Sequence, residues 1–398
     1  MSGLNVVFFF FNDDYSNWPQ RHKIDPFVDN NPGVTVTGVT FPVNLLTLFS
    51  NPARFVKFLL RPRRKIQEGI YSFTPFGLLP VTVINKNRIL INIHKWLYKI
   101  QIDNFLDSIK ASQNRITWIY YLWAAPVFSD IVEDSKLLVY QCDDEYTMEG
   151  AEILKEMKEI EDDLLKKADV VVAVSNKIYD ARKQKNKNCY LVPNAIDFDF
   201  FNKAASADTP LNEEMKDIPH PIAGYLGVIR SWVDFELLGF LADSLPKVSF
   251  VFVGPVEADV KKKADALGSR PNVRFLGNKD REVLPGILKG FDACLIPFSL
   301  NEFNLSTNPW KFWEYLATGK PILSLKIPDF EVYGDIVALY TTKEEALDKL
   351  RVILEKVDDD KVKRRMQLAK SNDVVARSKK WYDIVTKRLD DKNRNVGK

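Results

Sequence analysis

Cysteine is scarce in this sequence. Its 398 residues include three cysteines, an odd number spread too widely for a disulfide framework or a structural zinc site. Cys142, Cys189 and Cys294 each lie inside an apolar run, where a reduced thiol is usually buried. This usage is typical of a cytosolic chain, so we expect a cytoplasmic protein.

Charge of one sign and long hydrophobic runs are also lacking. Lysine and arginine number 56 against 53 acidic residues, and the net charge of +3 gives no argument for a nucleic-acid partner. The apolar run at 6–11 is too short for a signal core, Asp13 and Asp14 follow it at once, and no other run has the length of a membrane span. We therefore expect a protein that is soluble or peripheral at a membrane, without a nucleic-acid partner.

A dinucleotide-binding fingerprint is missing too. No G-x-G-x-x-G follows the apolar runs that end at Phe11 and Val228. Nicotinamide enzymes of the Rossmann type need these glycines to bring the backbone close to a pyrophosphate. The absence argues against a nicotinamide-dependent oxidoreductase.

The chain does contain a regular alternation of short apolar runs with helix-like segments, which is typical of parallel sheets covered on both faces. It predicts strands at 5–11, 35–40, 116–121, 137–142, 170–174, 190–192, 222–228, 248–253, 273–276, 293–297, 322–325 and 336–339, with a weaker one at 89–93. It predicts helices at 234–244, 280–288 and 309–317. The predicted fold class is α/β with two Rossmann-like sheets.

The length fits two domains of about 200 residues. Both patterns are weakest at 202–221, a stretch with A-A-S-A-D-T-P that ends in I-P-H-P, and we place the linker there. The predicted domains are then 1–201 and 222–375. The charged helical end, 376–398, has Trp381 and Tyr382 as its apolar anchors.

The most informative segment is 306–322, where helix signals and charged side chains occur together. Ser306, Thr307 and Asn308 offer N-caps, and Pro309 suits the first helical position. Gly319, followed by Pro321, is a stop signal. The segment predicts a helix whose N-terminus presents amide donors and a partial positive charge.

Two charged side chains complete this pattern. Lys311 lies in the first turn of the predicted helix, where its ammonium can reach the phosphates of a nucleoside diphosphate. Glu314 follows one turn later on the same face and can accept hydrogen bonds from ribose hydroxyls. An ordinary amphipathic helix with an exposed Lys and Glu is the simpler explanation of these two residues alone.

The same segment resembles the donor-site helix of GT-B glycosyltransferases, in particular bacterial family 4 enzymes and the related xanthan glucuronosyltransferase type. The pattern N-P-x-K-x-x-E-Y-L-A-x-G-x-P is matched at Asn308, Pro309, Lys311, Glu314, Tyr315, Leu316, Ala317, Gly319 and Pro321. The resemblance implies two Rossmann-like domains facing across a cleft. It also implies an N-terminal acceptor-binding domain, a C-terminal domain that binds the nucleotide sugar, and a last helix that packs back on the N-terminal domain.

Further segments resemble the family's landmarks in the same order. They are 140–145, 168–175, 192–197, 224–234 and 252–255. Ala195 stands where the family usually has glycine, which puts that turn in doubt. The resemblance spans about two thirds of the chain.

Several loop residues become candidate donor contacts. Gly227 and Gly254 follow strands, where a side chain would block the approach of phosphate oxygens, and Arg230 can clamp the diphosphate. The resemblance implies that the loop at 301–304 contacts the donor sugar. The donor set is Gly227, Arg230, Gly254, Asn301, Glu302, Asn304, Thr307, Asn308, Pro309, Lys311 and Glu314. A simple turn, a surface arginine and a solvated loop are the structural alternatives for these residues.

Asp143 and Asp144 are candidate catalytic groups on the acceptor side. Paired carboxylates after a strand suit a base that deprotonates an acceptor hydroxyl, as an inverting transferase requires. A retaining enzyme of this fold is thought to use the departing diphosphate instead. Family 4 resemblance favours retention and glucuronosyltransferase resemblance favours inversion, so the stereochemistry stays open. Both residues also suit a helix N-cap.

No essential metal or cofactor is expected. Asp197 and Asp199 form an Asp-x-Asp, but it follows the V-P-N landmark and not the strand that marks a metal-dependent GT-A enzyme. Lys311, the helix N-terminus and Arg230 can neutralise the leaving diphosphate without a divalent ion.

The segment 44–65 is apolar and strongly basic, and it predicts a helix for an anionic membrane surface. Its candidate membrane or acceptor contacts are Arg54, Lys57, Arg61, Arg63 and Arg64, and Lys65 adds a further charge. A core helix with a basic end is the alternative. The resemblance also implies that Arg21 and His22 face the cleft, with His22 a candidate catalytic group on the acceptor side.

These observations predict a GT-B glycosyltransferase that moves a sugar from a nucleotide diphosphate, most simply UDP, to a hydroxyl of a glycan or lipid-linked glycan. Such a reaction belongs to surface polysaccharide or glycoconjugate synthesis. Two alternatives are a sugar-nucleotide 2-epimerase of the same fold and a degenerate membrane-associated scaffold. The order of the landmarks argues against the first, and the presence of Lys311 and Glu314 argues against the second.

Overall fold

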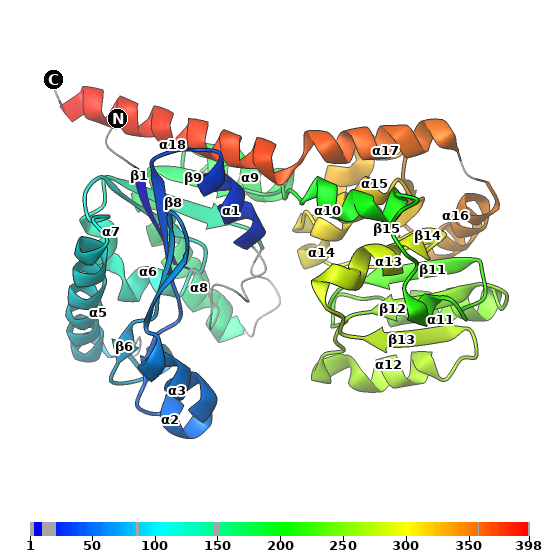
Figure 1. Ribbon diagram of the computed structural model, residues 1–398, viewed down its shortest axis with the longest axis horizontal. Coiled ribbons are helices and arrows are strands. Elements are labelled where there is room, and N and C mark those ends of the chain that lie inside the picture. The colour runs from blue at the N-terminus through cyan, green and yellow to red at the C-terminus, as the bar shows by residue number, and fades with distance from the viewer. Residues whose placement is uncertain (1–3, 10–20, 85–86, 146–150, 357, 397–398) are drawn as a thin grey trace. The chain divides into compact units, whose positions relative to one another are not determined.

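The computed structural model describes residues 4–9, 21–84, 87–145, 151–356 and 358–396 (Figure 1). The chain divides into two compact units. The first comprises Met1–Pro193 and Val375–Lys398, and the second comprises Asn194–Val374.

The first unit is built on an eight-stranded sheet in the order β10-β9-β8-β7-β1-β2-β5-β4. All neighbours are parallel except β4 and β5, which form an antiparallel pair. The strands are β1 (Leu4–Phe9), β2 (Val34–Val39), β4 (Arg63–Gln67), β5 (Ile70–Phe73), β7 (Arg115–Ile119), β8 (Leu137–Cys142), β9 (Val170–Ala173) and β10 (Cys189–Leu191). A separate parallel pair joins β3 (Val43–Asn44) to β6 (Phe76–Gly77).

Helices cover both faces of this sheet, because alternate side chains of its buried strands enter two cores. Val7 and Phe9 of β1 belong to one core and Val6 and Phe8 to the other. The helices are α1 (Arg21–Asp29), α2 (Thr47–Ser50), α3 (Pro52–Leu60), α4 (Val81–Ile84), α5 (Arg88–Ser108), α6 (Ala124–Val127), α7 (Ser129–Glu133), α8 (Ala151–Lys167), α9 (Asn176–Lys183) and α18 (Val374–Val396).

The last helix, α18, belongs to the first unit. Trp381 is fully buried there, with its ring 5.0 Å from that of Trp118 and 6.3 Å from that of Phe27. Lys392 further along the helix forms an ion pair with Asp169 at 2.9 Å. The chain therefore returns to its first unit after completing the second.

The second unit has a six-stranded parallel sheet in the order β13-β12-β11-β14-β15-β16. The strands are β11 (Ile222–Leu226), β12 (Ser249–Val253), β13 (Val273–Gly277), β14 (Ala293–Ile296), β15 (Ile322–Leu325) and β16 (Ala338–Tyr340). In chain order this is the 3-2-1-4-5-6 arrangement, whose growth reverses between β11 and β14. Ligands of such sheets bind beyond the carboxyl ends of the strands at that point.

The helices of the second unit are α10 (Phe198–Asn202), α11 (Phe235–Ser244), α12 (Lys261–Gly268), α13 (Leu284–Lys289), α14 (Glu302–Ser306), α15 (Trp310–Thr318), α16 (Lys343–Glu355) and α17 (Asp359–Ser371). The 3₁₀ turns are η2 (Lys203–Ala205), η3 (Glu213–Met215), η4 (Ala258–Val260), η5 (Arg281–Val283) and η6 (Pro328–Tyr333). The predicted helix at 280–288 is thus a 3₁₀ turn followed by an α-helix, with Pro285 inside α13.

The strand predicted at 89–93 is wrong. These residues lie at the start of α5, where the side chain of Asn87 accepts hydrogen bonds from the amides of Ile89 and Leu90. An N-cap of this kind begins a helix. A run of five residues is too short to show whether its apolar residues follow the period of a helix or that of a strand. The prediction also missed the β4–β5 hairpin.

The predicted linker at 202–221 lies inside the second unit, since the division falls at Pro193 and Asn194. Asn202 donates to the carbonyl of Ala317, and the ammonium of Lys289 donates to the carbonyls of Ser206, Ala207 and Thr209. These bonds hold the irregular segment against α13 and α15, two helices that lie far from it in the sequence.

The basic segment 44–65 is not one helix. It folds as α2 and α3, and the chain then enters β4, so Arg63, Arg64 and Lys65 lie in a strand. Pro62 explains the break. The residue before a proline is disfavoured in the α conformation, and proline has no backbone N–H to donate a helical hydrogen bond. No helix within the described residues is long and apolar enough to cross a membrane.

Candidate functional site: a glycine and lysine cradle at the switch point

The loop after β11 is shaped by Gly227. Its φ is +133°, a conformation that side chains rarely adopt, and its amide donates to the carbonyl of Val253 at 2.7 Å. A Cβ built on Gly227 would lie 2.4 Å from Cε and 2.5 Å from Nζ of Lys311. The Lys311 ammonium therefore rests directly on the backbone of this loop, where only glycine leaves it room.

Lys311 comes from the first turn of α15 and lies above the ring of Tyr225, with Nζ 5.2 Å from the centroid. Among the described residues no carboxylate forms an ion pair with it. Its positive charge is held at the carboxyl edge of β11 without neutralisation, as a phosphate-binding lysine requires.

Tyr315 fixes the helix that carries Lys311. Its buried hydroxyl accepts a hydrogen bond from the amide of Leu226 at 2.8 Å, which ties α15 to the last residue of β11. Burial raises the pKa of the Tyr315 hydroxyl well above its ordinary value, so it stays neutral. Sequence reasoning had matched this tyrosine to the family pattern without assigning it a role.

The helix ends differ slightly from the prediction. Pro309 occupies the N-cap position, with no side-chain cap, and Trp310 is the first helical residue. Ser306 instead ends α14, where its hydroxyl donates to the carbonyl of Glu302. At the other end Gly319 adopts the left-handed conformation with φ +72°, as the predicted stop requires.

Asn308 is bonded to other residues of the second unit. Its side chain is buried, accepts from the indole of Trp313 at 2.8 Å, and lies 3.4 Å from Asp329, while its carbonyl accepts from Asn194. The oxygen and the nitrogen of the Asn308 side-chain amide thus both have partners. Asn308 therefore helps to hold the N-terminus of α15, and the donor contact predicted for it stays a prediction.

Three neighbouring loops join at the same edge. The amide of Gly254 donates to the carbonyl of Gly277, and a Cβ on Gly254 would lie 2.2 Å from the carbonyl oxygen of Gly227. Arg230 is exposed, with its guanidinium 5.0 Å from the ring centroid of Trp232. The structure thus brings Gly227, Gly254, Arg230 and Lys311 to adjacent loops and a helix end, as the donor prediction requires.

The loop after β14 is tied to the loop after β11. The Asn301 side chain caps α14 by accepting from the amide of Asn304, and the side chain of Asn304 donates to the carbonyls of Trp232 and Ser299. Asn304 is fully buried, whereas Glu302 is exposed and Thr307 half-buried. Of the predicted sugar contacts, Glu302 has the exposure a ligand needs, and Asn301 and Asn304 shape the loop.

In the first unit, Asp143 and Asp144 follow directly after β8. Asp143 is half-buried and accepts a hydrogen bond from Gln141 at 2.6 Å, and Asp144 is exposed. Arg377 of α18 and the half-buried Tyr120, whose hydroxyl oxygen is itself buried, lie close to Asp143. Burial raises the pKa of the Tyr120 hydroxyl well above its ordinary value, and the charge of Asp143 adds to this; the same charge opposes the lowering of the Arg377 pKa by burial.

A buried ion cluster lies next to this pair, and sequence reasoning missed it. Arg182 of α9 bonds Glu161 of α8 at 2.9 Å and Glu145 at 2.5 Å, and Tyr140 donates to Glu161 at 2.8 Å. The cluster fixes the backbone immediately after Asp144. A single arginine within a charged helix gives no signal of this role, because its partners come from other elements.

Arg21 and His22 lie in the first turn of α1, and their side chains fall outside the described residues. In the basic segment, Arg54 is committed to packing: it donates to the carbonyl of Phe41 and lies 5.8 Å from its ring centroid. Lys57, Arg61 and Arg63 are exposed and Arg64 is half-buried.

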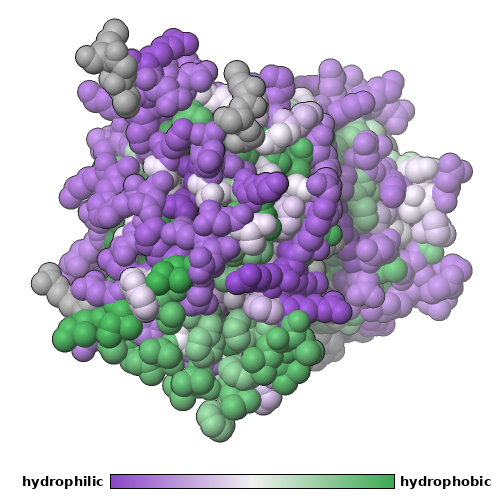
Figure 2. Space-filling view, turned by 60° about the vertical axis from the view of Figure 1, so that its left-hand side comes forward, coloured by the Kyte–Doolittle hydropathy of each residue, from purple (hydrophilic) through white to green (hydrophobic). Residues whose placement is uncertain are grey.

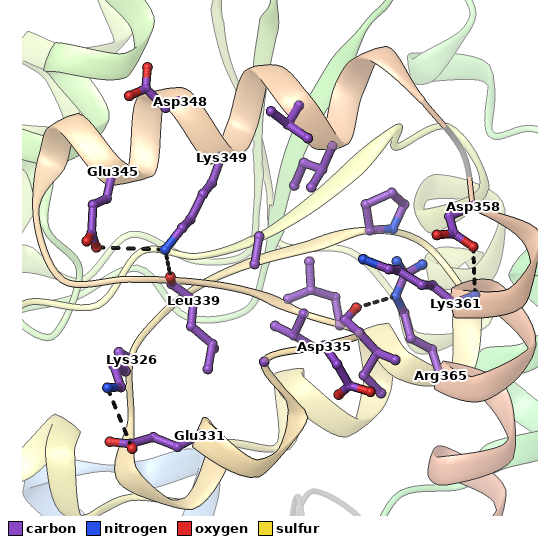
Figure 3. A pocket seen from close by; sticks show the side chains of 18 of the residues that line it. Lys326, Glu331, Asp335, Leu339, Glu345, Asp348, Lys349, Asp358, Lys361 and Arg365 are labelled. Carbon is purple, nitrogen blue, oxygen red and sulfur yellow. Dashed lines mark hydrogen bonds and ion pairs between the residues drawn. The ribbon is translucent and has the colours of Figure 1, made fainter.

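A cavity of about 780 Å³ in the second unit lies elsewhere, between η6, β16, α16 and α17 (Figure 3). Two of its cations bond backbone carbonyls: Lys349 donates to the carbonyl of Leu339, and Arg365 donates to those of Ile336 and Gly319. None of the predicted donor residues lines it. The size of a cavity therefore does not locate the candidate site, whereas the strand order and Lys311 do.

Comparison with known proteins shows what this architecture is similar to. HepE of Anabaena, solved in complex with UDP and glucose, matches 96% of this chain and 99% of its own with a TM-score of 0.64 at 12% identity. Sucrose-phosphate synthase of Thermosynechococcus elongatus matches 96% of this chain and 98% of its own, with a TM-score of 0.68 at 13% identity. This chain has the GT-B fold.

The sequence comparison points the same way. A putative teichuronic acid biosynthesis glycosyltransferase, TuaH of Bacillus subtilis, is 22% identical over 280 residues, which are 67% of this chain and 69% of TuaH. No protein-family model matches the chain. The GT-B resemblance of the donor helix is thus confirmed for the fold, and the sequence relative, TuaH, is named a glycosyltransferase.

Proposed function

We propose that this GT-B protein is a glycosyltransferase that uses a UDP-sugar. The observation that carries the proposal is the Lys311 ammonium, held against Gly227 at the switch point of the second sheet. The proposal is supported by HepE, which has been solved with UDP and with UDP-glucose. It also agrees with the name of TuaH.

In this proposal the second unit stabilises the leaving diphosphate. Lys311 and the amides at the N-terminus of α15 bind the phosphates, and Arg230 adds a second cation. Glu314, one turn after Lys311, accepts hydrogen bonds from the ribose, and the exposed Glu302 contacts the sugar. Charge that develops on the diphosphate as the glycosidic bond breaks is neutralised by these groups, so we propose that transfer needs no divalent ion.

The first unit then supplies the acceptor side. The acceptor is a hydroxyl of a glycan or lipid-linked glycan, in surface polysaccharide or glycoconjugate synthesis, and the enzyme works in the cytoplasm at an anionic membrane. If transfer inverts the anomeric centre, Asp143 or Asp144 is the base that takes the acceptor proton. If transfer retains it, the diphosphate takes that proton and both carboxylates orient the acceptor instead. Proton NMR of the product's anomeric configuration decides between these roles.

The first test is nucleotide binding. Calorimetric titration with UDP, GDP and dTDP, each with EDTA or with Mg²⁺, should show binding of UDP that does not depend on the metal. Lys311→Ala should weaken UDP binding by about tenfold or more, since a charge-assisted hydrogen bond contributes roughly 1.5–3 kcal/mol. Lys262→Ala, an exposed lysine on α12, is the matched control and should bind like the wild type.

The second test is transfer itself. Release of UDP from UDP-sugars should rise when a lipid-linked or soluble glycan acceptor is added, in EDTA as well as in Mg²⁺. Absence of binding by all three nucleotides would overturn the proposal, and a strict requirement for Mg²⁺ would overturn its metal-independent form.

A further inference from the structure

The charge of this chain is strongly segregated, although its sum is small. Between Asn30 and Ile102 the sequence has ten lysine and arginine residues and one carboxylate, Glu68. That segment carries a net charge of +9, so the rest of the chain carries −6 to give the overall +3. The balanced composition therefore conceals a basic region that includes α2, α3, β4 and most of α5.

The same region holds most of the exposed apolar side chains. Of eighteen large hydrophobic residues that are exposed among those described, thirteen lie between Leu45 and Ile100. Phe49 on α2 is 80% exposed, and Leu59 and Leu60 on α3 are 62% and 74% exposed. Isolated exposed leucines are ordinary, but a cluster of this kind marks an interaction surface.

Helix α3 places both kinds of side chain together. None of its nine residues is buried, and the apolar Val56, Leu59 and Leu60 share the helix with Lys57. Figure 2 shows a broad apolar area at the lower end of the face turned forward, the height at which Figure 1 places α2 and α3, with strongly hydrophilic residues above it. Val56, Leu59 and Leu60 are at least half exposed and gain little by packing against their own unit, so this apolar face fits an external partner.

Helix α5 contributes a second apolar stripe. Ile89, Ile93, Trp96 and Ile100 follow one another at spacings of four, three and four residues, and all are exposed. This spacing puts them on one side of the helix, while Tyr98, Ile102 and Phe105 pack into the core. The helix therefore has one apolar side for its own unit and another whose four members are 40–71% exposed.

Strand β6 connects the two helices. The ring of Phe58 on α3 stacks on that of Phe76 at 5.7 Å, and Gln101 on α5 bonds both backbone groups of Phe76. The exposed Leu78 follows directly. Strand β6 thus packs against both helices, and we call their two apolar stripes together the α3–α5 surface, with Leu59, Leu60, Ile93 and Trp96 as its representative members.

A small basic cavity opens beside α3. It has a volume of about 240 Å³ and is lined by Arg54, Lys57, Arg61, Arg64, Ser72 and Thr74 among others, with no carboxylate. Apart from Arg54, which already donates to the Phe41 carbonyl, three cations and two hydroxyls surround this space, and they suit a phosphate group, which arginine binds through its planar fork of donors. The cavity and the apolar surface thus call for a partner that has phosphate and hydrocarbon close together.

We propose that the α3–α5 surface docks on an anionic phospholipid bilayer, with a lipid phosphate in the basic cavity and the apolar side chains in the outer acyl region. An apolar helical face flanked by lysine and arginine binds membranes through both contributions. The inference rests on this surface and not on the donor site. Membrane binding measured without nucleotide therefore tests it separately from the proposed transfer activity.

The experiment is vesicle flotation at 50 mM and 300 mM salt. Vesicles of phosphatidylglycerol and phosphatidylcholine should bind the full chain, vesicles of phosphatidylcholine alone should bind it weakly, and high salt should reduce binding. Lys57→Gln with Arg61→Gln should lower the partition coefficient about thirtyfold, at about fivefold for each basic side chain. Lys262→Gln with Lys263→Gln, two exposed lysines of α12, is the matched control and should bind like the wild type.

A separate set of variants tests the contribution of the apolar side chains to membrane binding. Leu59→Ser with Leu60→Ser should lower partitioning by about tenfold or more, whereas Val332→Ser with Val352→Ser, 76% and 65% exposed in the second unit, should not change it. Bromine-labelled lipid should quench tryptophan emission in the wild type and less in Trp96→Phe. An unchanged circular dichroism spectrum and an unchanged thermal unfolding transition in each variant show that it is folded.

Three outcomes would overturn the proposal. One is wild-type chain that does not float with anionic vesicles at low salt, and another is equal binding by the α3 variants. The third is a dimer in sedimentation that Leu59→Ser with Leu60→Ser dissociates while vesicles bind nothing, because a second copy would then be the partner. If inorganic phosphate at millimolar concentration displaces the chain from vesicles, the cavity binds phosphate as proposed.

Discussion

Replacing Gly227 by alanine should displace the Lys311 ammonium although the lysine itself is unchanged. The new Cβ would lie 2.4 Å from Cε and 2.5 Å from Nζ of the lysine, closer than any real Cβ contact, and the flexible lysine end must move. The φ of +133° adds backbone strain of about 1–3 kcal/mol to the folded state. The free energy of unfolding should therefore fall by that amount, and the ammonium should leave the phosphate position.

The loss in binding follows from the same displacement. A charge-assisted hydrogen bond to phosphate contributes roughly 1.5–3 kcal/mol, so we expect UDP to bind Gly227→Ala about 10- to 150-fold more weakly. Gly334→Ala is the control, because its Cβ would meet no atom closer than the Glu331 carbonyl oxygen at 3.4 Å. That variant should bind UDP like the wild type.

A double-mutant cycle makes the reasoning refutable. If Gly227 acts through Lys311, its replacement should cost much less affinity in the Lys311→Ala background than in the wild type, and the two effects should not add. Calorimetric titration with UDP on the four proteins measures this. Additive losses would show that the glycine acts by another route, and wild-type affinity of Gly227→Ala would refute the contact as the basis of binding.

The other predictions concern the ribose, the buried ion cluster and the thiols. Glu314→Gln should weaken UDP about tenfold, and the preference for UDP over 2′-deoxy-UDP seen by titration in the wild type should disappear; a retained preference would contradict a ribose contact. Arg182→Met should lower the free energy of unfolding, measured by denaturant titration, by about 3–5 kcal/mol, because it leaves Glu161 buried without its cation. The control is Arg351→Met, whose arginine forms an exposed pair with Asp348 and whose loss should cost less than about 1 kcal/mol. Similar losses in both variants would refute the assignment. Burial raises the pKa of Cys294 to about 12 and that of Cys189 to about 11, so a thiol reagent at pH 8 should modify none of the three cysteines before unfolding and all three afterwards. These folded-state pKa values lie above the pKa of an unfolded cysteine, about 8.5. The contribution of the buried thiols to stability should therefore be constant below about pH 8.5 and fall as the pH rises toward 11–12, and a rise in stability over this range would contradict their burial.

Local signals in the sequence were enough for much of the fold. The strands Leu137–Cys142 and Ile322–Leu325 have the predicted bounds, because a buried parallel strand reads as a continuous apolar run between polar breaks. Gly319 ends α15 in the left-handed conformation, as its position after the periodic pattern predicted. The residues 89–93 show the limit, since a short apolar run fits a strand or a helix until Asn87 and the packing of α5 decide.

The sequence by itself determined the residue types of the candidate site: a lysine and a carboxylate one turn apart on a helix, and glycines after two strands. Short-range spacing and capping carry that information. Only the tertiary structure decided that Gly227 touches Lys311, that the Asn308 carbonyl accepts from Asn194, that Arg182 holds the segment beside Asp144, and that α18 packs Trp381 against Trp118. These contacts join residues far apart in the chain, and they exist because buried surfaces must be filled and buried charges paired, conditions that no local pattern expresses.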